Sequence, residues 1–144
     1  MEIPETLLKV AAIFFDIVFV LFVAYLVFVL GFRLYWKRKV KKMRGQELPV
    51  LDGEFVRLKK GKGVIYFHSP NCQPCKFVEP VVKKLSKEFR KVRFVKVNVL
   101  ENPDVARKFG ILATPSIIIT RDGRIEDVLA GPVTEGVLRA KLGK

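Results

Sequence analysis

A long apolar segment near the N-terminus constrains this chain more than any other feature. Residues 10–32 read VAAIFFDIVFVLFVAYLVFVLGF, and the only charged side chain among them is that of Asp16. As a helix rising about 1.5 Å per residue, the segment is long enough to cross a hydrocarbon core about 30 Å thick. A soluble core helix would show a polar face, and a signal peptide would carry its positive charges before the apolar run. The segment therefore predicts a single membrane-spanning helix over about residues 10–32.

The flanking charges predict how this helix crosses the membrane. Residues 33–44 carry seven cations and no acid, whereas Lys9 is the only basic side chain before the segment. Because basic residues favour the cytoplasmic side, we expect the C-terminal part of the chain in the cytoplasm and the short N-terminus outside. The basic run abuts the apolar segment without any nucleic-acid-binding motif. Its expected partner is therefore an anionic membrane surface and not nucleic acid.

Asp16 has two interpretations. An acid within lipid is costly and indicates a function or a partner helix. Alternatively, the span starts near Ile17, and Asp16 lies at the outer interface. Residues 17–32 are apolar without interruption, and Tyr35 and Trp36 follow where interfacial aromatic residues are typical. We favour the interfacial interpretation.

The rest of the chain divides where its pattern changes. Residues 1–36 form the N-terminal segment with the helix, residues 37–53 form a basic juxtamembrane linker, and residues 54–144 form a domain of short alternating elements. Apolar runs and alternation predict strands at 54–58, 64–68, 92–99, 116–120 and 124–130. Helical spacing and capping residues predict helices at 74–89, 103–109 and 133–142. This order predicts an α/β fold, with a mixed central sheet and helices on both faces.

The two cysteines of the chain stand two residues apart, in HSPNCQPCKF (residues 68–77). One such pair cannot fill a four-coordinate zinc site, and a loop this short gives a structural disulfide little stabilising effect. The pair instead follows a buried-type strand and opens a helix. The partial positive charge of a helix N-terminus stabilises a thiolate at Cys72. The placement favours a redox pair, while metal or iron–sulfur binding remains the alternative.

Several motifs together resemble the thioredoxin family over about residues 54–144. They are VIYFHSPNCQPCKFVEP, FVKVNVLENPDVARKFGILATPSIIIT and DGRIEDVLAGPVTEGVLRAKL. They contain a strand followed by CxPC, a proline inside the next helix at Pro80, and Thr114-Pro115 before a strand. The resemblance implies the thioredoxin-like fold and thiol–disulfide chemistry.

The resemblance also implies a role for each matching residue. Cys72 corresponds to the exposed attacking thiolate, and Cys75 to the buried resolving thiol, so that a redox-active Cys72–Cys75 disulfide forms. Pro115 should follow a cis peptide bond. The residues that complete the motif or the substrate groove are Gln73, Pro74, Thr114 and Gly131. Lys96 matches a buried lysine and is a candidate proton-transfer partner.

The sequence departs from the family at three places. Asn71 replaces the usual aromatic residue before the first cysteine, and most of the first strand and helix are missing. Tyr66 stands where a buried acid normally assists the resolving thiol, and a phenol with a pKa near about 10 is a poor base at neutral pH. We interpret His68 as a packed or half-exposed residue rather than a catalytic one.

The sequence thus predicts a membrane-anchored enzyme that reduces protein disulfides and is re-reduced by a reductase or another electron donor. Gln73-Pro74 resembles the Gly-Pro of reducing family members, which favours reduction. No metal or cofactor is expected. An alternative relocates the same chemistry outside the cytoplasm, where the protein would be a reductant for exported proteins or cytochrome assembly.

Overall fold

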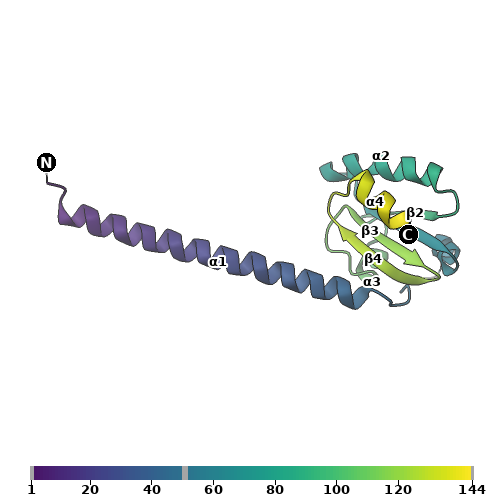
Figure 1. Cartoon of the computed structure of the whole chain (residues 1–144), viewed down its shortest axis with the longest axis horizontal. Helices are drawn as coiled ribbons and strands as arrows, with labels where there is room; N and C mark the ends of the chain where they lie inside the picture. Colours follow the sequence, from purple (N-terminus) through teal and green to yellow (C-terminus); the bar gives the residue numbers. More distant parts are fainter. Residues whose placement is uncertain (1, 50–51, 144) are drawn as a thin grey trace. The chain divides into compact units, whose positions relative to one another are not determined.

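The N-terminal helix α1 is the longest element of the chain (Figure 1). A computed structural model describes residues 2–49 and 52–143. The chain divides into two compact units between Lys39 and Val40. Helix α1 runs from Glu5 to Met43, no residue in it is buried, and it is long and apolar enough to cross a membrane. It extends beyond the predicted span 10–32 at both ends, so the first half of the predicted linker is helical.

A four-stranded mixed sheet forms the centre of the second unit. Its strands are β1 (Lys62–His68), β2 (Arg93–Asn98), β3 (Ser116–Arg121) and β4 (Arg124–Ala130), in the order β2-β1-β3-β4. Strand β1 pairs in parallel with β2 and antiparallel with β3, and β3 pairs antiparallel with β4. Residues 63–67 of β1 are all buried, which explains their nearly continuous apolar sequence.

Helices cover both faces of the sheet, as the sequence predicts. One face packs on α2 (Gln73–Glu88) and α4 (Glu135–Leu142), and its core includes Val64, Tyr66 and Leu85. The opposite face packs on η1 (Gly53–Lys59) and α3 (Pro103–Lys108), and its core includes Ile65, Phe67 and Phe109. Successive side chains of β1 therefore pack into the cores on opposite faces of the sheet, because side chains alternate along a strand.

The predicted strand at 54–58 is wrong. The segment is instead the 3-10 helix η1, which begins at Gly53 with a φ of +58° that favours glycine. Phe55 and Leu58, three residues apart, both pack into the core on this face of the sheet. That spacing suits a helical turn, in which residues i and i+3 lie on one side. The sequence EFVRL predicts a strand by its alternation. Five residues are too few to distinguish the two-residue repeat of a strand from the three-residue repeat of a 3-10 helix.

Residues 45–48 of the predicted linker are held against the edge of β4. The Gly45 amide donates to the Ile125 carbonyl at 2.7 Å, and the Ile125 amide donates to the Gln46 carbonyl at 2.9 Å. The Leu48 amide donates to the carbonyl of Gly123 at 3.0 Å, and the Leu48 side chain is buried. This segment shields an edge strand whose backbone groups would otherwise be open to pairing.

A buried carboxylate fastens the same segment to the domain. Asp127 on β4 has a side chain only 7% exposed and lies 2.5 Å from both Arg44 and Lys141. Its burial favours the neutral acid, but hydrogen bonds from Lys141, Arg44 and the Val128 amide outweigh this and lower the pKa of Asp127. Asp127 therefore ties the end of the basic run to the C-terminal helix.

Candidate active site

The cysteine loop lies between the end of β1 and the start of α2. Strand β1 ends at His68, Cys72 is the N-cap residue of α2, and the helix begins at Gln73. Pro74 occupies the first turn, where the missing N–H has no intrahelical partner to lose. Gln73 and Pro74 are both exposed. The loop thus carries Cys72 and Cys75 to the positive end of a helix 16 residues long.

Cys72 and Cys75 form a disulfide with a Cα–Cα distance of 5.2 Å. The Sγ of Cys72 also accepts a hydrogen bond from the Cys75 amide, with 3.2 Å between the nitrogen and the sulfur. The expectation that Cys72 is exposed is wrong for this disulfide form, since its exposed fraction is 9%, against 4% for Cys75. In this form the Cys72 sulfur is bonded to the Cys75 sulfur and accepts a hydrogen bond from the first turn of α2.

A second loop contributes the proline motif. The Thr114–Pro115 peptide bond is cis, and Pro115 is buried immediately before β3. The Gly131 amide donates to the carbonyl of Pro115 at 2.9 Å, with Gly131 at a φ of +86° that favours glycine. The hydroxyls of Ser69 and Thr114 lie 3.4 Å apart and link this loop to the cysteine loop. The Ser69 contact was not predicted.

Tyr66 lies behind the resolving cysteine. Its side chain is buried on β1, and its hydroxyl donates to the Cys75 carbonyl at 3.3 Å. Burial, and secondarily the negative charge of Glu79, raises the pKa of Tyr66 to about 12. Tyr66 therefore contacts the first turn of α2 as a neutral hydrogen-bond donor, in line with the expectation that it is a poor base.

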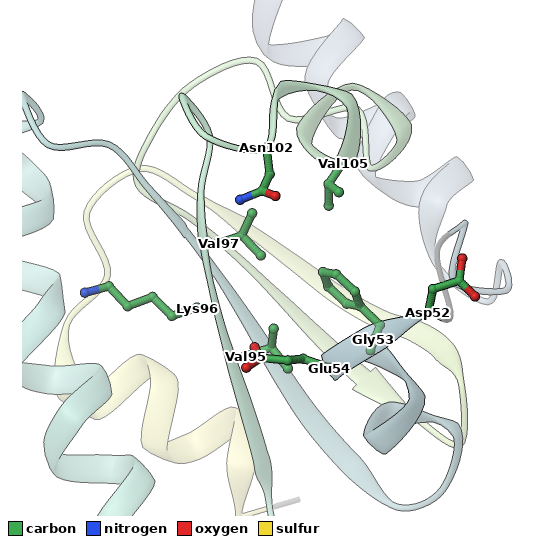
Figure 2. A pocket seen from close by; sticks show the side chains of 9 residues that line it. Asp52, Gly53, Glu54, Val95, Lys96, Val97, Asn102 and Val105 are labelled. Atoms are coloured by element: carbon green, nitrogen blue, oxygen red, sulfur yellow. The ribbon is translucent and has the colours of Figure 1, made fainter.

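Lys96 differs from its expected burial. Its side chain is 49% exposed and forms an ion pair with Glu79 on α2. Because β2 is the outermost strand on its side of the sheet, the long side chain reaches past the sheet into solvent. Figure 2 shows it directed away from Val95 and Val97, which point to the opposite face. No local pattern indicates the pairing of Lys96 with Glu79, because the two residues lie on different elements.

His68 is half-buried at the end of β1, and its ring stacks on Tyr66 with centroids 5.5 Å apart. Burial and then the charge of Lys96 lower the pKa of His68, while the charges of Glu79 and Glu101 oppose this shift. The half-buried environment agrees with the interpretation made from the sequence. The structure adds that His68 belongs to a cluster of charged groups beside Tyr66.

A separate hollow of about 400 Å³ lies between η1, β2 and α3 (Figure 2). Apolar side chains of Phe55, Val95, Val97 and Val105 line it, and neither cysteine does. It therefore lies apart from the dithiol chemistry. Among residues 2–49 and 52–143, no group of three or more His, Cys, Asp or Glu side chains is placed to hold a metal ion.

Comparison with known families matches the second unit to one family model. The model described as thioredoxin matches residues 53–144. Thioredoxin 1 of Synechococcus elongatus is 38% identical over 82 residues, which cover 56% of this chain and 77% of the relative. The thioredoxin of Synechocystis is 36% identical over 96 residues, which cover 66% of this chain and 84% of the relative.

Solved structures give the same result. Oxidized mitochondrial thioredoxin 3 from Saccharomyces cerevisiae superposes with a TM-score of 0.56 at 31% identity, covering 61% of this chain and 82% of the yeast protein. Thioredoxin from Fasciola hepatica superposes with a TM-score of 0.58 at 32% identity, covering 62% of this chain and 86% of the fluke protein.

Proposed function

The chain belongs to the thioredoxin family and is a thiol–disulfide oxidoreductase, and we propose that it is a membrane-anchored reductase of protein disulfides. The observation that carries the proposal is the Cys72–Cys75 disulfide at the N-terminus of α2, in a chain that also contains the long apolar helix α1. The first feature supplies the chemistry, and the second supplies the location.

The reaction takes place in two exchanges. The Cys72 thiolate attacks one sulfur of a substrate disulfide, forms a mixed disulfide and releases the first substrate thiol. The Cys75 thiolate then attacks Cys72, which releases the second substrate thiol and leaves the Cys72–Cys75 disulfide. Two electrons pass from the dithiol to the substrate, and an external reductase or other donor restores the dithiol.

The helix N-terminus favours attack by Cys72. A thiolate at the N-cap gains from the helix dipole and from the free amides of the first turn, both of which lower the pKa of a thiol there. In the disulfide form, the Cys75 amide already points at the Cys72 sulfur at 3.2 Å. Thr114, Pro115 and Gly131 are proposed to line the groove for the substrate chain, with the loop beside the cysteines held by the Ser69–Thr114 contact.

Helix α1 is proposed as a single membrane span with the redox domain on the cytoplasmic side. The basic residues of the run 33–44 would then lie on the anionic inner surface. Arg44, the last of them, is fixed to Asp127 of the domain. Substrates would be proteins with disulfides close to the membrane.

Activity is tested with the full chain in detergent micelles. Reduction of insulin by dithiothreitol should accelerate with the wild-type protein and not with Cys72→Ser. Cys75→Ser should stop at the mixed disulfide, which mass spectrometry detects. A wild-type chain that leaves insulin reduction at the rate of dithiothreitol alone would refute the reductase assignment.

Topology is tested in intact cells with a membrane-impermeant thiol reagent after mild reduction. Labelling of Cys72 only after lysis would place the domain in the cytoplasm, with a soluble reductase as the expected donor. Labelling before lysis would place the domain outside. The protein would then need electrons delivered across the membrane and would act on exported proteins.

A further inference from the structure

The resolving step requires a base for the Cys75 thiol, and the CxPC motif does not contain one. Cys75 must lose its proton before it attacks Cys72, because the thiolate is the nucleophile. The buried residue behind it is Tyr66, whose pKa of about 12 prevents it from accepting that proton at neutral pH. A base other than Tyr66 would therefore speed this step. The inference below rests on the proposed dithiol mechanism.

His68 is placed for this task. It lies on the same face of β1 as Tyr66, against which its ring stacks, and the Tyr66 hydroxyl contacts the Cys75 carbonyl at 3.3 Å. Glu79 lies four residues after Cys75 on α2, so both residues occupy one side of the helix, and Glu79 interacts electrostatically with His68. A surface hollow of about 170 Å³ beside Tyr66, Glu79 and Lys96 gives solvent access to this side of α2.

We propose that His68 accepts the proton of the Cys75 thiol during the resolving step, in place of a carboxyl group at position 66. Among the described residues no hydrogen bond joins His68 to Cys75, so the proposal requires a water molecule that bridges the imidazole and the Cys75 thiol. The Cys75–S⁻ then forms the bond to the Cys72 sulfur, and the bond from Cys72 to the substrate sulfur breaks. The departing substrate thiolate takes up a proton, which returns His68 to its neutral form.

The surroundings of His68 suit a base that works near neutral pH. Burial and Lys96 from β2 lower its pKa from an ordinary value of about 6.5, whereas Glu79 from α2 and Glu101 after β2 act in the opposite direction. The net lowering favours the neutral imidazole, which is the form that can accept a proton. The carboxylates of Glu79 and Glu101 stabilise the imidazolium that forms.

The resolving rate can be measured apart from the first attack. Reduced full-length protein in micelles is mixed with excess oxidised glutathione and quenched with acid. Mass spectrometry then separates the dithiol, the mixed disulfide and the final disulfide. The wild-type resolving rate should fall as pH drops through the pKa of His68. In His68→Asn, the rate at pH 7 should fall by about 100-fold, the lower end for general bases, and this inflection should vanish.

Two further variants separate proton transfer from packing. His68 is the only histidine of the chain, so one set of imidazole NMR signals reports its pKa. Lys96→Met removes a positive neighbour and should raise this pKa, whereas Glu79→Gln removes a negative neighbour and should lower it. The inflection in the resolving rate should shift with the NMR titration in both variants. Asp104→Asn on the exposed side of α3 is the matched control that shifts neither.

The outcomes distinguish this inference from the proposed function. A resolving-rate inflection that persists in His68→Asn would refute the role of His68. So would an inflection that stays fixed while the NMR pKa shifts in Lys96→Met and Glu79→Gln, even if His68→Asn folds poorly. Absence of any mixed disulfide in the wild type would instead refute the dithiol mechanism itself.

Discussion

Helix α1 and the redox domain contain the same apolar residue types in opposite environments. Phe28 on α1 is 70% exposed, whereas Phe67 on β1 is fully buried. The domain surrounds its apolar side chains with its own sheet and helices, while α1 has no buried residue at all. The bilayer of the proposed membrane anchor would supply a low-polarity medium for these exposed side chains. The comparison suggests that location and chemistry reside in separate parts of the chain, which mutations can separate.

The largest expected effect is the loss of activity in Cys72→Ser, with membrane association unchanged. The substitution removes the nucleophile, so insulin reduction should fall to the rate of dithiothreitol alone. Membrane fractions should retain the protein, because α1 is untouched. Cys75→Ser is the matched control, since it keeps the first attack. Turnover by Cys72→Ser would show that the chemistry does not depend on this pair.

The reverse experiment changes α1 and leaves the cysteine pair intact. Each arginine at the centre of a spanning helix costs about 2.5–3.5 kcal/mol of insertion free energy. Val20→Arg combined with Val23→Arg should therefore shift the protein out of carbonate-washed membranes. The same variant purified in detergent should reduce insulin at the wild-type rate. Full retention in washed membranes would contradict a spanning role for α1, and Val20→Leu with Val23→Leu controls for substitution itself.

A matched pair of phenylalanines tests the contrast in burial directly. Phe67→Ala should lower the domain's free energy of unfolding by about 3–5 kcal/mol, because a buried aromatic ring is replaced by a cavity beside Phe109. Phe28→Ala should leave this free energy unchanged, since Phe28 lies in the other unit. Urea titration in micelles, followed by far-UV circular dichroism, measures both. Equal losses would mean that the two units unfold together.

The same division explains what could be predicted from the sequence. Helix α2, strand β1 and the cysteine pair follow local patterns, namely apolar periodicity and turn residues, which is why their predicted positions lie within a residue or two of the structure. The exposure of Lys96 depends on β2 being the outermost strand of the sheet, which is a matter of sheet order and not of local sequence. The attachment of the linker through Arg44 and Asp127 joins residues that are 83 positions apart, and no local pattern encodes such a pair.

The Arg44–Asp127 contact also gives the smallest of the expected effects. Asp127→Asn should cost about 1–3 kcal/mol of unfolding free energy, below the cost of breaking a fully buried pair, because the Arg44 and Lys141 side chains are 52% and 41% exposed. Asp104→Asn is the control, since Asp104 and its partner Arg107 are exposed and such pairs contribute little.

The pH dependence of the unfolding free energy tests whether the negative charge of Asp127 causes this stabilisation. Its pKa is lower in the folded state than in the unfolded chain, so its contribution is present above the unfolded pKa, about 3.9, and is lost as pH falls through the folded value. Wild-type stability should therefore drop more steeply than that of Asp127→Asn below about pH 4. Parallel acid unfolding curves would mean that the carboxylate is not what holds residues 44–48 to the domain. Residues 45–48 would then be held to the domain by backbone pairing with β4 and by the buried Leu48 side chain.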